Sequence, residues 1–367
     1  MILVKAKRDE LLTPLSSVSG IIERRHTLPI LSNVLIEKTG DTLSFLATDI
    51  EIQIVSRSAL EQAGDPKGIT VGARKLVEIL RALPDGEVTL STQDKRLQVK
   101  SGRSRFSLQT LPAEDFPRLS RPAGEVSKFS MPQKALRKLL ALVQYAMAQQ
   151  DIRYYLNGLL LVVEDKQLKL VATDGHRLAY CSIALEAELS RQEVIVPRKT
   201  ILELSKLLQD TDELVTIEIS STQAAFTFGT IELVSKLVDG KFPDYTRVIP
   251  KDHKNTAIID RESLRQSLSR AAILSNEKFR GVRWVLADNV LKIVSSNAEQ
   301  EEANEELEVK YSGLALDIGF NVTYLLDVLN NVAGGEIEVS FGDAASSALI
   351  HFPAEKDFKY VVMPMRI

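Results

Sequence analysis

The sequence is poor in the residues and motifs that would support a disulfide framework, a metal site or a membrane anchor. Its one cysteine, Cys181, excludes an internal disulfide and fits a reducing compartment. None of its four histidines has another histidine or a cysteine at metal-ligand spacing. No apolar run is long enough to span a membrane, and Met1–Lys5 is predicted to be a first strand, not a signal peptide. We therefore expect no metal, no cofactor, no membrane and a cytoplasmic location.

Motifs for enzymatic chemistry are equally scarce. The sequence has no glycine-rich phosphate loop and no Gly-x-Ser-x-Gly nucleophile elbow. Only Thr173–Arg177 resembles an active site, since Asp174, His176 and Arg177 follow a predicted strand directly. A triad requires a nucleophile, and the sequence nominates none. A hydrolase using these three side chains is the alternative function, and we expect no catalytic residues.

The charge balance is slightly acidic, with a net charge of −3 from 46 basic and 49 acidic residues. Such a balance argues against nucleic-acid binding, which usually requires a basic surface. The bases are concentrated in helical stretches, however, while acids gather between Glu299 and Glu306. An acidic chain with one basic face is still a candidate for DNA binding. The helical bases are Lys134, Arg137, Lys138, Arg198, Lys199, Lys206, Arg261, Arg265 and Arg270.

The most informative pattern that is present is a threefold internal repeat. Ala47-Thr48-Asp49 recurs as Ala172-Thr173-Asp174, 125 positions later, and Phe116-Pro117 recurs as Phe242-Pro243 after 126. A diverged third copy places Ser295-Ser296-Asn297 123 positions after the second. Three such periods fill almost all of the 367 residues, which predicts one unit copied three times. The predicted domains are residues 1–122, 123–250 and 251–367.

Each copy has the same order of signals, which predicts an α+β fold with two helices and antiparallel sheets in every copy. The predicted helices are residues 9–22, 73–83, 133–147, 199–208, 260–274 and 323–332. Period-two strands lie between them. Turn residues at Gly40-Asp41 and at Glu164–Lys166 predict hairpins that would join 34–36 to 43–47 and 159–163 to 168–172.

Two segments carry signals that the repeat does not explain. Asp151–Asn157 joins a cation to two tyrosines in a loop, where the rings could equally pack a core or face a ligand. Tyr360–Ile367 is apolar to its last residue, whereas chain ends are normally polar. We expect a last strand that completes the third copy's sheet, followed by Met363-Pro364-Met365 as an adaptable peptide-binding surface.

Several longer motifs, in order along the whole chain, resemble the bacterial β sliding clamp family, the processivity subunits of DNA polymerase III. These motifs are Thr27–Leu31, Ser101–Ser107, Asp151–Gly158, Ala172–Leu178, Ser235–Gly240, Phe242–Tyr245, Ala271–Val282 and Val361–Arg366. The chain departs from the family at Ile367, where leucine is expected, and at Arg24–His26, which varies a more glycine-rich loop.

The resemblance implies a head-to-tail homodimer whose six clamp domains form a closed ring around duplex DNA. Twelve helices at about 9 Å each would give a circumference of ~110 Å and an opening of ~25 Å, which admits B-form DNA. A ring held topologically needs no tight phosphate grip, which accounts for the net charge of −3.

Implied partners are a clamp loader, the replicative polymerase and other proteins with clamp-binding peptides, in the nucleoid region of the cytoplasm. A repeat scaffold that never meets DNA is a further alternative.

Three groups of site residues follow from the resemblance. A peptide groove between copies two and three is expected at Leu156, Thr173, Gly175, His176, Arg177, Leu178, Pro243, Arg247, Val248, Asn321, Tyr324, Ser347, Val361, Val362, Met363, Pro364, Met365 and Arg366. A dimer contact is expected between Arg96, Arg103, Arg105, Phe106 and Leu108 of copy one and Ile273, Leu274, Glu299, Glu301, Glu302 and Glu305 of copy three. DNA contacts are expected at Arg24, Arg25, Gln150, Arg153, Tyr154, Tyr155, Arg198 and Lys199.

Overall fold

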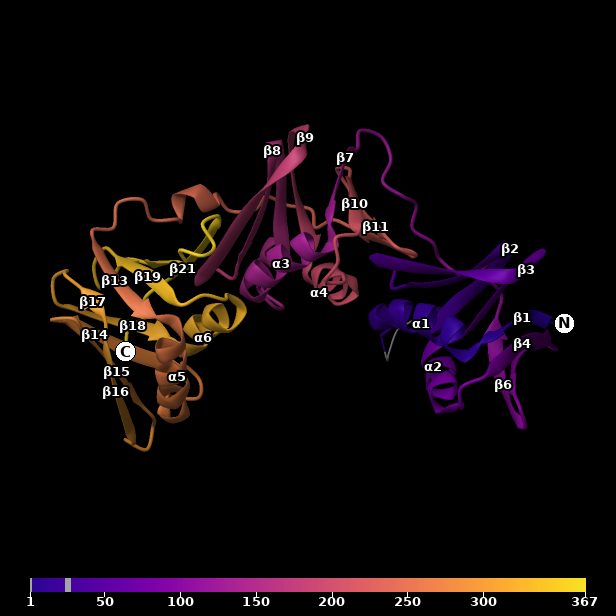
Figure 1. Ribbon diagram of the computed structural model, residues 1–367, viewed down its shortest axis with the longest axis horizontal. Coiled ribbons are helices and arrows are strands. Elements are labelled where there is room, and N and C mark those ends of the chain that lie inside the picture. Colours follow the sequence, from indigo (N-terminus) through magenta and orange to yellow (C-terminus); the bar gives the residue numbers. More distant parts are fainter. Residues whose placement is uncertain (1, 24–27) are drawn as a thin grey trace. The chain divides into compact units, whose positions relative to one another are not determined.

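The computed structural model describes residues 2–23 and 28–367, and for residues 60–67 it describes the backbone alone. The chain forms two compact units (Figure 1). The first comprises residues 1–136 and 202–237, and the second comprises residues 137–201 and 238–367. The predicted second copy is therefore shared between the units, because its strands continue the sheets of copies one and three.

Six α-helices lie in the described part of the chain, two in each predicted copy. They are α1 (Arg8–Val18), α2 (Ala73–Ala82), α3 (Gln133–Val143), α4 (Arg198–Leu207), α5 (Arg261–Ala271) and α6 (Val322–Asn331). The first helix of each copy continues into a 3-10 turn: η1 (Ser19–Ile21), η3 (Gln144–Ala146) and η6 (Ala272–Leu274). The predicted helices are thus confirmed to within a few residues. Side-chain caps begin two of them, since Asp260 accepts from the Ser263 amide and Asn321 from the Thr323 amide.

The first unit contains one antiparallel ten-stranded sheet, in the order β1-β4-β5-β6-β3-β12-β11-β10-β7, with β2 paired to β3. Its strands are β1 (Ile2–Lys7), β2 (Asn33–Thr48), β3 (Ile52–Gly72), β4 (Glu87–Gln93), β5 (Arg96–Ser101), β6 (Ser104–Leu111), β7 (Ser127–Pro132), β10 (Leu214–Ile219), β11 (Gln223–Phe228) and β12 (Ile231–Lys236). The β3–β12 pair joins copy one to copy two, with Ile54 opposite Leu233.

The second unit contains two antiparallel sheets, ordered β17-β13-β19-β20-β21-β9-β8 and β16-β15-β14-β18. Their strands are β8 (Gly158–Thr173), β9 (Arg177–Pro197), β13 (Asn255–Asp260), β14 (Gly281–Ala287), β15 (Val290–Ser296), β16 (Glu302–Glu308), β17 (Lys310–Tyr311), β18 (Leu316–Asn321), β19 (Glu336–Phe341), β20 (Ala348–His351) and β21 (Phe358–Val362). The predicted last strand, β21, is confirmed and also pairs with β9 of copy two. Within this unit α5 packs beside α6 (Figure 1).

The two predicted hairpins at Gly40 and at residues 164–166 are wrong. β2 and β8 each run straight through these positions and pair along their length with one long partner, β3 or β9. Gly40 and Asp165 have φ of +59° and +54°, and the register shifts beside them. The turn-forming residues therefore lie in a bulge within each strand, and the chain does not reverse there. The chain reverses instead at residues 49–51 and 174–176.

An apolar cluster in the second unit supports the candidate site. Its buried members include Leu156, Leu178, Phe242 and Val361, drawn from four segments far apart in the sequence. The partly buried side chains of Tyr155, Tyr180, Val238, Tyr245, Ile249 and Leu349 pack against it. The fold thus brings the loop before β8, the start of β9 and the end of the chain to one place.

Neither a membrane span nor a metal cluster is found in the described ranges. No helix there is both long and apolar enough to cross a bilayer. Within the same residues, no group of three or more histidine, cysteine, aspartate or glutamate side chains is placed to hold a metal ion.

Candidate functional site

The turn between β8 and β9 is held by its own side chains. Thr173 Oγ1 donates to the Arg177 carbonyl at 2.6 Å, and Asp174 Oδ1 accepts from the amides of His176 and Arg177 at 2.9 and 3.1 Å. Gly175 has φ of +88°, a left-handed conformation that glycine adopts without a steric penalty. A Cβ at this position would lie 2.8 Å from Arg153 Nη1. Backbone conformation and space both favour glycine here.

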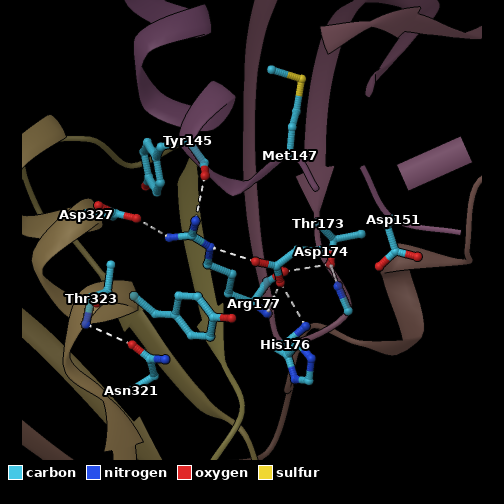
Figure 2. Close-up of polar contacts among 12 residues, drawn as sticks. Tyr145, Met147, Asp151, Thr173, Asp174, His176, Arg177, Asn321, Thr323 and Asp327 are labelled. Carbon is cyan, nitrogen blue, oxygen red and sulfur yellow. Dashed lines mark hydrogen bonds and ion pairs between the residues drawn. The ribbon is translucent and has the colours of Figure 1, made fainter. Parts of the chain in front are cut away.

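Arg177 is the best-connected polar side chain at this turn, and only 9% of its surface is exposed (Figure 2). Its Nε donates to Asp174 Oδ2 at 3.1 Å, Nη1 to Asp327 Oδ2 at 2.5 Å, and Nη2 to the Tyr145 carbonyl at 2.6 Å. The guanidinium carbon also lies 4.5 Å from the centre of the Tyr324 ring, a cation–π contact. Arg177 therefore ties α6 and η3, the 3-10 turn that follows α3, to the turn between β8 and β9, and its nitrogens are engaged within the chain.

Buried tyrosines surround this cation. Burial raises the pKa of Tyr145 and of Tyr360, whose rings lie 5.9 Å apart. Burial alone would lower the pKa of Arg177, but Tyr360 and the hydrogen bond to Asp327 outweigh that effect and raise it. The Tyr360 hydroxyl donates to the Tyr324 carbonyl at 2.8 Å, which links β21 to α6. Arg177 is thus a permanent cation in a fixed position.

The predicted groove residues divide into a buried framework and an exposed rim. The buried members are Leu156, Thr173, Arg177, Leu178, Val361 and Val362. The exposed members are Gly175, His176, Pro243, Arg247, Val248, Met363 and Arg366, and the half-buried ones are Asn321, Tyr324, Ser347, Pro364 and Met365. On the rim, the His176 ring stacks on Tyr324 with centroids 6.4 Å apart, and Arg247 Nε lies 3.0 Å from Asp244. The structure therefore brings a scaffold and accessible side chains together in one unit.

The C-terminal tail borders the same region. Beyond β21 the Met363 amide donates to the His176 carbonyl, and the Met365 amide to the Gly319 carbonyl, both at 2.9 Å. A Cβ at Gly319 would lie 2.5 Å from the Met365 carbonyl oxygen and 2.6 Å from Ile367, so a larger residue there would displace the tail. The Met363 side chain is 47% exposed. These hydrogen bonds fix the backbone of the tail, while the Met363 side chain is exposed to solvent.

The predicted DNA contacts are only partly described, because Arg24 and Arg25 lie outside the described residues. Arg153 donates to both carboxylate oxygens of Asp151, at 3.0 and 2.9 Å, and to the Asp174 carbonyl at 3.1 Å. The loop that carries it is thereby bonded to the groove's turn.

The other predicted DNA residues differ in exposure. Gln150 is exposed and Tyr154 is 58% exposed, whereas Tyr155 packs against the apolar cluster. Tyr155 therefore packs in the core, as one of the two predicted possibilities had it, and Tyr154 is accessible to solvent. Arg198 donates to the Met147 carbonyl at 2.9 Å, and half-buried Lys199 follows it in α4.

The predicted dimer residues lie on or beside two strands that each have an unpaired edge. Residues 104–109 of β6 pair with β5 alone, and β16 pairs with β15 alone, so one edge of each has no strand partner in the described chain.

The side chains at these two edges differ in charge, and both edges include apolar residues. Exposed Arg96, Arg103 and Arg105 form no ion pair with any described side chain. Half-buried Phe106 and Leu108 lie on the same strand, and η6 presents Ile273, 77% exposed, with Leu274 half-buried. Glu299, Glu301 and Glu302 are exposed, while Glu305 accepts from Arg270 of its own chain at 2.8 and 2.5 Å.

The hydrolase alternative is not supported by this geometry. Asp174 accepts from the backbone amide of His176, and its other oxygen is bonded to Arg177, so it does not orient the imidazole. Within the described residues, no hydrogen bond joins that imidazole to a hydroxyl or thiol. Cys181 is buried, and burial raises the pKa of its thiol, which disfavours the nucleophilic thiolate.

Several residues at this site were not predicted from the sequence. Asp327 and the Tyr145 carbonyl complete the shell around Arg177, and Gly319 seats the tail. Phe242, a member of the apolar cluster, appeared in the sequence as part of a repeated Phe-Pro pair and of a family motif, but not as a site residue. No local pattern marks Asp327, because its partner lies 150 residues away in sequence.

Comparison with known proteins covers the whole chain. Three family profiles match: the N-terminal domain of the DNA polymerase III beta subunit over residues 3–120, its central domain over 130–244 and its C-terminal domain over 246–366. A beta sliding clamp of Pseudomonas aeruginosa is 50% identical over 365 residues, or 98% of this chain and 99% of that protein. The beta sliding clamp of Escherichia coli is 47% identical over 362 residues, with the same coverage.

Solved structures agree with these matches. A Pseudomonas aeruginosa sliding clamp bound to griselimycin has a TM-score of 0.96 and 49% identity, and the match covers 100% of both chains. A Caulobacter crescentus beta sliding clamp has a TM-score of 0.94 and 39% identity, over 100% of this chain and 99% of that one. The three copies found in the sequence are three clamp domains, and the chain belongs to the bacterial β sliding clamp family, the beta subunits of DNA polymerase III.

Proposed function

We propose that this protein encircles duplex DNA without catalysing a reaction and tethers the replicative polymerase and other DNA-processing proteins to it. The observation that carries the proposal is the match of all three clamp domains from end to end of the chain. Further proposed features are the domain boundaries at residues 1–122, 123–250 and 251–367, a clamp loader as partner, and a place in the cytoplasm at the nucleoid.

Retention on DNA tests encirclement directly. The clamp is loaded onto nicked circular DNA, and retention is measured by gel filtration at low and high salt before and after the circle is linearised. Direct phosphate contacts weaken steeply with salt, whereas a threaded ring does not depend on them. We expect retention on circles at high salt and loss after linearisation. Equal retention on circles and linear fragments at high salt would show that the protein does not encircle DNA.

We propose a head-to-tail homodimer in which the free edge of β6 meets the free edge of β16 of a second copy, closing a ring. An unpaired strand edge readily pairs with another strand, and the two edges carry opposite charges. The apolar contact of Phe106 and Leu108 with Ile273 and Leu274 is expected to dominate, since exposed ion pairs contribute little.

Disrupting the apolar part of this contact should yield folded monomers. The test variant is Ile273→Ala with Leu274→Lys, and the matched control is Leu314→Lys, which changes another apolar side chain, 80% exposed, away from either edge. Mass is measured by analytical ultracentrifugation at micromolar protein. A double variant that remains dimeric would contradict the proposed interface.

We propose that the rim and framework residues named above form a groove for short peptides with a glutamine and paired apolar residues. Apolar side chains of the peptide would pack over the apolar cluster, between the turn and the tail. Deleting Met363–Ile367 removes the tail but leaves β21, which ends at Val362. We expect peptide binding to be lost while the dimer persists, and unchanged affinity in a fluorescence-anisotropy titration would remove this site from consideration.

We propose that DNA contacts inside the ring are weak and independent of sequence. Arginine and lysine would meet phosphates, and exposed Tyr154 could stack on a base beside a duplex end. Alanine at Arg25, Arg153 and Tyr154 should weaken low-salt binding while circle retention persists. Unchanged low-salt binding would show that these residues are not the contacts, even if the ring is correct.

A further inference from the structure

A hollow of about 470 Å³ lies beside the proposed groove and is lined by residues outside it. Three of its lining residues are lysines, Lys169, Lys251 and Lys359, and none of those described is acidic. Tyr180, Tyr245 and Ile249 form an apolar wall. The combination of a cationic rim and an aromatic wall is unlike the framework of the groove itself.

Strand register places this hollow and the groove on one sheet face. Residues directly opposite one another in an antiparallel ladder project to the same side, as do alternate residues along a strand. Val361 is opposite Leu178, which is opposite Thr173, and these three are proposed groove residues. The next row on that face holds Lys359, Tyr180 and Val171, and the row after it holds Ser182 and Lys169. The sheet surface therefore runs from the groove into the lysines without interruption.

The lysines leave the hollow with net positive charge. Lys169 Nζ lies 3.2 Å from Glu164, which also pairs with Arg191 at 2.9 Å, and Arg191 pairs in turn with Glu193 at 3.1 Å, so the unneutralised charge comes from the other two lysines. Lys251 and Lys359 form no ion pair with any side chain that the structure describes. A ligand carrying carboxylates would find unneutralised cations here.

The aromatic wall favours a peptide over single-stranded DNA. The rings of Tyr180 and Tyr245 stack on each other, with centroids 5.8 Å apart and planes at 27°. Both rings also pack against the apolar cluster, together with Ile249. Their faces are therefore occupied, whereas single-strand binding uses open aromatic faces for base stacking.

We propose that this hollow is a cationic extension of the peptide groove, which receives acidic residues flanking the apolar anchors of a clamp-binding peptide. The proposal rests on the groove proposed above. It assigns the choice among partner peptides partly to charged residues outside the anchor. Lys251 is exposed, and Lys169 and Lys359 are half-buried, so we expect a modest, salt-dependent gain in affinity.

The experiment compares peptides that share one anchor sequence. One peptide is neutral, and two others carry three glutamates, either before or after the anchor. Affinities for the full-length dimer are measured by fluorescence anisotropy at 50 and 300 mM salt. The test variant combines Lys169→Gln, Lys251→Gln and Lys359→Gln. The matched control combines Lys5→Gln, Lys38→Gln and Lys128→Gln, which removes the same charge from the first unit.

We expect one acidic peptide to bind wild type about three- to tenfold more tightly than the neutral one at low salt. This gain should disappear in the test variant, persist in the control and shrink at high salt, while neutral-peptide affinity stays constant. Equal binding of acidic and neutral peptides, or a gain that survives in the test variant, would overturn the extension but not the groove. A neutral peptide that fails to bind wild type would overturn both. Competition by single-stranded DNA, lost in the test variant, would reassign the hollow to nucleic acid.

Discussion

The turns after β2 and β8 have one hydrogen-bond pattern but different contents. In the first copy Thr48 Oγ1 donates to the Ile52 carbonyl at 2.8 Å, and Asp49 Oδ1 accepts from the amides of Glu51 and Ile52 at 2.9 and 2.8 Å. Thr173 and Asp174 make the same bonds in the second copy. The Thr-Asp pair therefore builds a turn common to the fold and is no sign of catalysis.

The residues that follow this pair separate the two turns. The left-handed position holds Ile50 in the first copy, at φ +72°, and Gly175 in the second. In the first copy the next strand begins with Ile52, which is buried. In the second copy it begins with Arg177, which donates hydrogen bonds to Asp327 and to the Tyr145 carbonyl. The second turn thus differs from the first by a glycine in the left-handed position and a cation at the start of the next strand, and the following changes test the effect of these differences.

Replacing Arg177 by the isoleucine found at the same point of the first copy should have the largest effect on stability and on peptide binding. Arg177→Ile would leave Asp174 and Asp327 without their shared cation and remove the tie between α6 and the turn. Loss of one partner from a buried pair typically costs about 3–5 kcal/mol. We expect a fall of that order in the free energy of unfolding from urea titration, with at least tenfold weaker peptide binding. A variant of wild-type stability would show that the network is incidental.

Filling the left-handed position of the second turn should have a moderate effect. Gly175→Ala places a Cβ at positive φ and 2.8 Å from Arg153 Nη1. The conformational cost is about 1–2 kcal/mol, and the arginine must move. We expect lower stability in the same urea titration and weaker low-salt DNA binding, because Arg153 lies in the loop proposed to contact DNA. Wild-type values for both would contradict the coupling of turn and loop.

The same position in the first copy should respond in the opposite direction. Ile50→Gly relieves a β-branched residue held at φ +72°, and Ile50 is already 39% exposed. We expect the free energy of unfolding to rise by up to about 1 kcal/mol, since relief of strain exceeds the small loss of burial. Peptide binding should not change. A destabilised variant would mean that Ile50 packing outweighs its backbone strain.

The smallest expected effect is the loss of stability at acid pH that comes from Asp151, in the loop bonded to the second turn. Hydrogen bonds from the Arg153 side chain lower the pKa of Asp151 to about 2 from its ordinary 3.8. A depressed pKa means that the stabilising contribution is present above the ordinary value and is lost as pH falls through about 2. Carboxyl chemical shifts followed by NMR should place the Asp151 midpoint near pH 2. In Arg153→Gln the midpoint should return toward the ordinary value, and a normal midpoint in wild type would refute the pairing.

Local sequence patterns determined the repeat, the six helices and the terminal strand. Periodicity and capping act over a few residues, so they can be recognised without knowledge of the fold. The hairpin predictions failed because a glycine or aspartate with positive φ can make either a turn or a bulge. Which one forms depends on whether a long partner strand is available, and β3 and β9 provide that partner.

The residues of the proposed groove came from a family resemblance, whereas their arrangement came from tertiary structure alone. Nothing near Arg177 in sequence indicates that Asp327 and Tyr145 will engage its nitrogens, or that Gly319 will seat the chain's last residues. The same holds for Lys169, Lys251 and Lys359, which three separate segments bring together. Hydrogen bonds and charge clusters depend on distances in space, and those distances are set by how strands of different copies pair.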